Sequence, residues 1–121
     1  MRKIFLVEDD HGIRETLEIL LTDEGYNVQS FASVAEFQNR QKTVIPDLYL
    51  FDVMLPDGSG ADLCGQIKQD KNNLHIPVIM MSAHANLQEI KSTCTPDDFV
   101  PKPFDIENLL SRVKEAIIKL Q

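Results

Sequence analysis

The sequence contains Leu48-Tyr49-Leu50-Phe51-Asp52, four consecutive apolar residues that end in an acid. An apolar run with no polar residue on either face is typical of a parallel strand that helices cover on both sides. We therefore expect a central strand here. Four further segments are also predicted to be strands: Lys3–Val7, Tyr26–Phe31, Pro77–Met81 and Asp98–Val100.

Apolar residues recur at helical spacing between these strands, which predicts βα units and a largely parallel sheet. Gly25 can stop the first helix, and Ser33, Ser59 and Asp105 can cap later ones. Asp10 is expected at the rim of the sheet or as a cap of the first helix. The five predicted helices lie around Ile13–Leu21, Val34–Phe37, Leu63–Ile67, Leu87–Ile90 and Ile106–Leu120.

Polar side chains follow four of the five predicted strands. The carboxyl ends of neighbouring parallel strands meet at one edge of a sheet, where ligands of open α/β sheets bind. Three carboxylates, a hydroxyl and an ammonium group are therefore expected to converge in one crevice. The residues are Glu8 and Asp9, Asp52, Ser82 and Lys102.

Three carboxylates cannot share a crevice in ionised form without compensation. Two like charges about 5 Å apart repel by roughly 3 kcal/mol at an effective dielectric constant near 20. A divalent cation would compensate this repulsion, and Mg²⁺ suits a set of hard oxygen ligands. One Mg²⁺ and Lys102 balance the three carboxylates, and a phosphoryl group on Asp52 changes the net charge to about −1.

Length and composition limit the remaining possibilities. The 121 residues are expected to form one domain, 1–121, and the net charge of −7 disfavours direct binding of nucleic acid. No apolar run approaches the roughly 18 residues of a membrane helix, so a soluble cytoplasmic protein is expected. Cys64 and Cys94 lack metal-ligand spacing and are expected to be reduced thiols. Asp97 and Asp98 are interpreted as solvated loop charges.

Taken in order, the motifs of this chain resemble the receiver domain of two-component response regulators. The resemblance covers essentially the whole chain, and no single motif would suffice for it. The residues that carry it are Leu6-Val7-Glu8-Asp9-Asp10, Pro46–Asp52 with Leu55-Pro56 and Gly60, Pro77–Ser82 with Ala83, and Lys102-Pro103-Phe104.

The resemblance implies a flavodoxin-like, doubly wound five-stranded parallel sheet of order 2-1-3-4-5 with five helices. It also implies that Asp52 accepts a phosphoryl group from a sensor histidine kinase in a Mg²⁺-dependent reaction. Metal ligands would be Asp9, Asp52 and the Met54 backbone carbonyl, with Glu8 acting through water. Lys102 and Ser82 would bind phosphoryl oxygens, Ser82 and Phe99 would form a switch, and Met54 and His84 would tune dephosphorylation.

The implied partners are a sensor histidine kinase or phosphotransfer protein and an unknown downstream protein or output domain. A homodimer through the face of the fourth helix, fifth strand and last helix is also conceivable. This face departs from the family pattern, because the stretch from Ser82 to Lys102 is short and Thr95-Pro96 replaces a small turn. Pro101 predicts an edge strand, and the Lys102-Pro103 bond is left open between cis and trans.

Two rival functions remain at this stage. A phosphatase of the haloacid-dehalogenase type would share the fold, Mg²⁺, the aspartate nucleophile and the lysine, but it should carry an acid where this chain has Met54. A pseudo-receiver would act only as a phosphorylation-independent binding module. The complete set of Glu8, Asp9, Asp52, Ser82 and Lys102 argues against the pseudo-receiver. The sequence thus predicts a signalling phosphoacceptor rather than an enzyme, capable only of its own phosphoryl transfer and slow autodephosphorylation.

Overall fold

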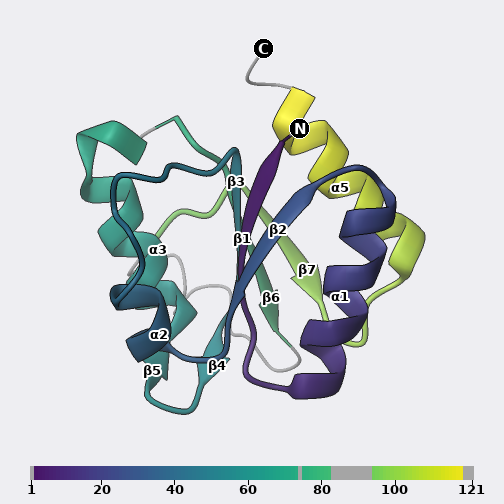
Figure 1. The fold of residues 1–121 in the computed structure, drawn as a ribbon, viewed down its shortest axis with the longest axis horizontal. Coiled ribbons are helices and arrows are strands. Elements are labelled where there is room, and N and C mark those ends of the chain that lie inside the picture. The colour runs from purple at the N-terminus through teal and green to yellow at the C-terminus, as the bar shows by residue number, and fades with distance from the viewer. Residues whose placement is uncertain (1, 74, 83–93, 119–121) are drawn as a thin grey trace.

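A computed structural model of the chain describes residues 2–73, 75–82 and 94–118. Its centre is a five-stranded parallel sheet in the order β2-β1-β3-β6-β7 (Figure 1). The predicted fold class and strand order are confirmed, and β7 lies at an edge as Pro101 predicted. The strands are β1 (Lys3–Val7), β2 (Asn27–Phe31), β3 (Leu48–Asp52), β6 (Val78–Ser82) and β7 (Asp98–Pro101).

Helices cover both faces of the sheet (Figure 1). The described α-helices are α1 (His11–Asp23), α2 (Val34–Gln38), α3 (Gly60–Gln69) and α5 (Ile106–Ile118), with a 3₁₀ turn at Lys71–Asn73. The predicted helix around Leu87–Ile90 lies outside the described residues. Among the helices described, none is long and apolar enough to cross a membrane.

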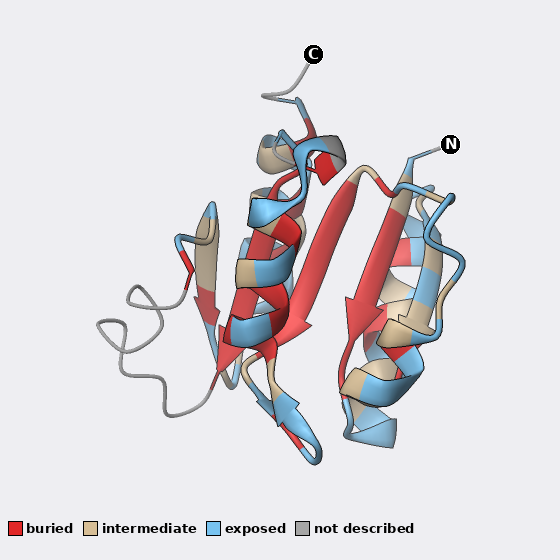
Figure 2. Cartoon of the chain, turned by 90° about the vertical axis from the view of Figure 1, so that its left-hand side faces the viewer, coloured by how far each residue is buried: buried red, intermediate tan, exposed pale blue. Residues whose placement is uncertain are grey.

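Two apolar clusters form the core, one on each face of the sheet. One cluster joins α2 and α3 to the sheet and is rich in aromatic rings, including Phe37 packed edge-on against Phe31 and Phe51. The other joins α1 and α5 through Leu17, Leu21 and Leu109. Every residue of β3 and β6 is buried, as expected of strands covered on both sides (Figure 2).

The predicted capping residues do cap the described helices. Asp10 Oδ1 accepts a hydrogen bond from the backbone N–H of Ile13, and Ser33 Oγ accepts one from Glu36. Ser59 and Asp105 cap α3 and α5 in the same way. Gly25 adopts a φ of 93°, the left-handed conformation that glycine favours after a helix.

A short antiparallel hairpin follows β3 and was not predicted. Its strands are β4 (Met54–Leu55) and β5 (Gly58–Ser59), and it lies between β3 and α3. The hairpin places Asp57 at the start of α2, where its two carboxylate oxygens accept hydrogen bonds from the N–H groups of Val34 and Ala35, both at 2.9 Å. Asp57 therefore connects the loop after the central strand to a helix 22 residues earlier.

Replacement of Asp57 by asparagine is expected to lower the urea midpoint of unfolding at pH 7. The hydrogen bonds from Val34 and Ala35 hold the pKa of Asp57 below its ordinary value. A lowered folded-state pKa gives stability above the unfolded-state pKa, and this stability is lost as the pH falls through the folded-state value. The difference between wild type and variant should therefore shrink below about pH 4.

The matched control for this prediction is Glu115→Gln, which removes an acidic charge from an exposed position of α5. It should leave the midpoint nearly unchanged at both pH values. An Asp57→Asn protein as stable as wild type at pH 7 would contradict the capping role.

The expectation of two reduced thiols is wrong for this structure. Cys64 of α3 and Cys94 form a disulfide, with their Cα atoms 5.7 Å apart and a sequence separation of 30. Both side chains lie in the cluster that joins α3 to the sheet. Spacing along the chain could not reveal the pair, because the fold brings the two residues together from distant segments.

Candidate functional site

The residues predicted to converge lie at one edge of the sheet. The parallel register pairs Val7 with Phe51, Asp52 with Met81 and Ser82 with Pro101, so β1, β3, β6 and β7 end at the same level. Glu8 and Asp9 directly follow β1, Asp52 and Ser82 are the last residues of β3 and β6, and Lys102 follows β7. The strand ends that carry these residues therefore meet at one edge of the sheet, as the sequence predicted.

An acidic cluster occupies this edge. Glu8, Asp9 and Asp52 each offer a carboxylate oxygen, and these oxygens lie within 4.8 Å of one another. Glu8 is fully buried and Asp52 is 5% exposed, whereas Asp9 faces solvent. Oxygens on opposite sides of one Mg²⁺ are about 4.2 Å apart. The cluster therefore fits a small hard cation after only a slight closure.

Lys102 supplies the positive charge next to the cluster. Its Nζ lies 2.5 Å from Glu8 Oε1 and 3.2 Å from Asp52 Oδ2. Burial alone would lower the pKa of Lys102, but its hydrogen bonds to Glu8 and Asp52 and the charges of both acids outweigh burial and raise it. The ammonium group therefore stays protonated and bridges the two buried carboxyls.

Glu8 is an acid of the site whose charged form is disfavoured by burial. Burial raises the pKa of Glu8 to about 7, and the nearby charge of Asp52 adds to the rise. The hydrogen bonds from Lys102 and from the N–H of Asp10, at 3.1 Å, act in the opposite direction. The hydrogen bond from Lys102 therefore offsets only part of the effect of burial on the pKa of Glu8.

Arg14 contributes to the site and was not predicted. From the first turns of α1, its guanidinium donates hydrogen bonds to the backbone carbonyls of Glu8, at 2.9 Å, and Asp9, at 3.3 Å. It also contacts His11 Nδ1 at 3.2 Å. Arg14 fixes the backbone that carries two of the three acids. Sequence patterns offer no signal for a contact between a side chain and a backbone carbonyl.

Two residues of the segment after β3 shape the surroundings of Asp52. The Met54 side chain is 67% exposed, two residues beyond Asp52. The N–H of Gly60 donates to the carbonyl of Val53 at 2.9 Å. A Cβ atom at Gly60 would lie 2.1 Å from the backbone oxygen of Asp52, so only glycine fits there.

The predicted switch residues lie on neighbouring strands. Ser82 is 3% exposed, and its carbonyl accepts a hydrogen bond from the N–H of Lys102 at 2.9 Å. Phe99 is partly buried on β7 beside Met80 of β6, and its carbonyl accepts a bond from Arg112 at 3.0 Å. His84 lies outside the described residues. The Lys102-Pro103 peptide bond is cis.

Comparison with known proteins agrees with this fold. The family model described as the response regulator receiver domain matches residues 4–114. The chain therefore belongs to the response regulator receiver domain family, which serves two-component signal transduction.

Curated relatives extend the similarity to named proteins. The chain is 34% identical to the DNA-binding dual master transcriptional regulator RpaA of Synechocystis, over 97% of the chain and 49% of the relative. It is 35% identical to the phosphate regulon regulator PhoB of Rhizobium meliloti, over 95% of the chain and 52% of the relative. The chain spans about half the length of the curated relatives it matches.

Solved structures are similar over nearly their whole length. The non-phosphorylated HemR receiver domain of Leptospira biflexa has 33% identity and a TM-score of 0.86, covering 97% of this chain and 94% of that chain. The response regulator TrrA of Thermotoga maritima, solved in complex with Mg²⁺–BeF, has 26% identity and a TM-score of 0.82, covering 96% and 99%.

Proposed function

We propose that Asp52 accepts a phosphoryl group from a phosphohistidine and that residues 1–121 act as one receiver domain. The observation that carries this proposal is a nearly buried carboxylate at the end of the central strand, with two acids beside it and Lys102 Nζ at 3.2 Å. A carboxylate oxygen attacks phosphorus, the P–N bond breaks, and the released imidazole takes up a proton. Phosphoryl transfer depends mainly on positioning and charge stabilisation, which such a site can supply.

Mg²⁺ is the proposed cofactor of this reaction. The Asp9 and Asp52 carboxylates and the Met54 backbone carbonyl would be direct ligands, and Glu8 would act through water. The close spacing of the carboxylate oxygens supports this set, as does the Mg²⁺–BeF complex of TrrA. A bound divalent cation neutralises the charge of the transferring group.

Lys102 and Ser82 are proposed to bind the phosphoryl oxygens once Asp52 is modified. Lys102 already contacts Asp52, so its ammonium group needs little movement to reach an added phosphoryl group. Phosphorylation raises the local negative charge and draws Lys102 away from Glu8. The Ser82 carbonyl is bonded to the N–H of Lys102, which couples the two residues through the backbone as well.

Phe99 is proposed to report this change at the surface. It lies on β7, three residues before Lys102 in the chain and beside β6, which ends at Ser82. A displacement of Ser82 and Lys102 toward a phosphoryl group therefore acts on both strands that hold Phe99. The result is a population shift between two packings of this edge of the sheet.

The proposed phosphoryl donor is a sensor histidine kinase or a phosphotransfer protein. A hollow of about 290 Å³ lies beside Lys102, between α1 and the start of α5, and Ile13, Phe104 and Ile106 give it an apolar lining. This hollow would seat an apolar contact of the donor close to Asp52. The signal is proposed to pass to a downstream protein or an output domain. Formation of a homodimer through the β7–α5 face is a further proposed result of phosphorylation.

The test uses acetyl phosphate as a small phosphoryl donor. In the presence of Mg²⁺ the wild type is expected to gain the mass of one phosphoryl group, and Asp52→Asn to gain none, because an amide is not a nucleophile for phosphorus. Intact-mass spectrometry measures both. An unmodified wild type would overturn the acceptor function and favour a pseudo-receiver, whereas a modified Asp52→Asn would overturn the assigned residue.

Chelation of Mg²⁺ provides the control for the cofactor, since the adduct should form far more slowly in its absence. Decay of the adduct after removal of acetyl phosphate tests the two proposed tuning residues. Met54→Ala and His84→Ala are expected to change the decay rate, and unchanged decay in both would remove them from the site.

A further inference from the structure

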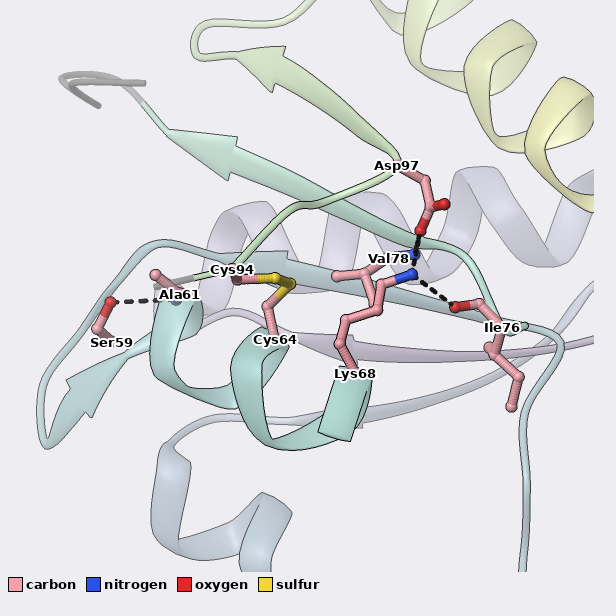
Figure 3. The surroundings of a disulfide bond; sticks show 8 residues. All are labelled: Ser59, Ala61, Cys64, Lys68, Ile76, Val78, Cys94 and Asp97. Carbon is pink, nitrogen blue, oxygen red and sulfur yellow. Dashed lines mark hydrogen bonds and ion pairs between the residues drawn. A yellow bond between two sulfur atoms is a disulfide. The ribbon is translucent and has the colours of Figure 1, made fainter. Parts of the chain in front are cut away.

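The disulfide joins α3 to the segment that leads into β7 (Figure 3). Cys64 lies on the buried face of α3, and Cys94 lies four residues before the first residue of β7. Their Cα separation of 5.7 Å is ordinary for a disulfide. The bond thus connects two segments that the sheet hydrogen bonds do not connect.

A second, non-covalent connection lies next to the disulfide (Figure 3). Lys68, one helical turn after Cys64, donates to Asp97 Oδ2 at 2.6 Å. The same oxygen accepts the N–H of Val78 at 2.8 Å, and the N–H of Asp97 donates to the Val78 carbonyl at 2.8 Å. Asp97 is therefore a structural anchor rather than the solvated charge that the sequence suggested.

Reduction would break the disulfide but not the connection through Asp97. The anchor at Asp97 uses hydrogen bonds and one ion pair, which remain when the disulfide opens. The start of β7 should therefore stay in place, while Cys94 loses its covalent connection to α3. Reduction is thus expected to loosen one segment without unfolding the domain.

The position of Cys94 along the chain relates the disulfide to the proposed function. Cys94 lies between Ser82, which ends β6, and Phe99 of β7. These two residues are proposed above to sense and to report phosphorylation. The disulfide holds Cys94 against α3 in the unphosphorylated structure. A constraint of this kind stabilises the state that it fits.

We propose that Cys64 and Cys94 are a reversible thiol–disulfide switch that controls how readily the segment from Cys94 to Phe99 rearranges on phosphorylation. The oxidised form resists the rearrangement and the reduced form permits it. The effect on phosphorylation rests on the proposed function of Asp52, whereas the switch in the segment before β7 does not.

The redox step requires only a low-molecular-weight disulfide as oxidant. One cysteine thiolate attacks the reagent, forms a mixed disulfide and releases one reagent thiolate. The second cysteine thiolate attacks the protein sulfur and releases the other. Two electrons pass to the reagent, and the two cysteine protons go to the two released thiolates. A dithiol reductant reverses the step, reaching Cys94, which is 6% exposed, before the fully buried Cys64.

The first experiment asks whether the switch exists. The chain is treated with oxidised glutathione or with dithiothreitol, alkylated and weighed, and amide hydrogen exchange is measured at residues 94–100. We expect no labelled thiol and slow exchange at Cys94 and Thr95 after oxidation, two labelled thiols and faster exchange there after reduction, and a midpoint of thermal unfolding about 10 °C higher when oxidised. Two labelled thiols after oxidation, or identical exchange in both forms, would overturn the switch.

The second experiment asks whether the switch acts on phosphorylation. With acetyl phosphate and Mg²⁺, the reduced form is expected to gain the phosphoryl group at least about fivefold faster than the oxidised form. The double variant Cys64→Ala with Cys94→Ala should react equally fast under both conditions. Equal rates of the two wild-type forms, or a redox difference in the double variant, would overturn the effect on phosphorylation.

The two proposals fail in distinguishable ways. If no form of the protein gains a phosphoryl group, the function proposed for Asp52 is overturned. Thiol counting and hydrogen exchange do not involve phosphorylation, so they still support or overturn the switch in that case.

Discussion

Replacement of Lys102 by methionine is expected to destabilise the metal-free protein by about 3–5 kcal/mol. The variant keeps most of the side-chain volume but leaves the buried Glu8 carboxyl and the nearly buried Asp52 carboxyl without their shared cation. Removing one partner of a buried ion pair is strongly destabilising because the remaining charge is uncompensated. Urea unfolding in the presence of a chelator measures the loss.

Two further measurements identify the cause of that loss. Excess Mg²⁺ should recover part of the stability, because a divalent cation at the acidic cluster replaces the missing positive charge. The double variant Glu8→Gln with Lys102→Met should also be more stable than Lys102→Met alone, since it removes the buried acid that lost its partner. If neither Mg²⁺ nor the Glu8→Gln substitution restores stability to Lys102→Met, the loss of stability comes from packing and not from charge.

Lys68→Met is the matched control for Lys102→Met. Lys68 forms an ion pair of similar length with Asp97, at 2.6 Å, but its partner is 45% exposed. An exposed pair contributes roughly 0–1 kcal/mol. Equal losses in the two variants would contradict the special position of Lys102. Lys102→Met should also accept the phosphoryl group from acetyl phosphate more slowly, since it lacks the charge that is proposed to face the phosphoryl oxygens.

The sequence predicted the elements that depend on local patterns. β3 and β6 are continuous apolar runs, and both are buried at every residue. Ser33 and Ser59 are ordinary helix caps, and each bonds the N–H group that its position predicts. The convergence of polar residues followed from one rule, that parallel strands end at the same edge of the sheet.

The features that escaped prediction all join segments far apart in the chain. The Cys64–Cys94 disulfide and the two bonds from α2 to Asp57 depend on which segments lie side by side. Arg14 bonds the backbone, which carries no residue-specific signal. Lys102 was expected to face a phosphoryl group, and its close pairing with Glu8 depends on the burial of that acid, which the sequence does not give.

These features place the site under two opposing demands. The metal-free site must keep three carboxyl groups close together. Lys102 and the N–H of Asp10 stabilise the Glu8 carboxylate there by donating hydrogen bonds to it. In the proposed function, phosphorylation of Asp52 draws Lys102 toward the phosphoryl group. The short contact between Lys102 and Glu8 would then oppose activation, and a cation bound at the cluster would weaken this opposition by compensating the Glu8 charge in place of Lys102.

Replacement of Gly60 by alanine is expected to impair the site through the backbone of Asp52. The added Cβ would lie 2.1 Å from the Asp52 carbonyl oxygen and 3.3 Å from Met80 Cε. Cβ atoms do not approach backbone closer than 3.0 Å, so the end of β3 or the start of α3 must shift by about 1 Å. We expect a loss of stability of about 1–3 kcal/mol, measured by urea unfolding.

The larger effect of Gly60→Ala should be on chemistry. A misplacement of about 1 Å in a reacting group can slow a reaction about 100-fold. The rate of phosphoryl gain from acetyl phosphate is therefore expected to fall far more than stability does. The rise in the midpoint of thermal unfolding on addition of Mg²⁺ should be smaller as well, because Asp52 is both a proposed ligand and the displaced residue.

Gly12→Ala is the control for this prediction, since it adds the same methyl group to an exposed position of α1. The nearest atom to the added Cβ would be Asp10 Oδ1 at 3.4 Å, an ordinary contact. Alanine favours a helix over glycine by up to about 1 kcal/mol, so this variant should be as stable as wild type or more stable. If Gly60→Ala reacted with acetyl phosphate as fast as Gly12→Ala, the position of the Asp52 backbone would not limit phosphorylation.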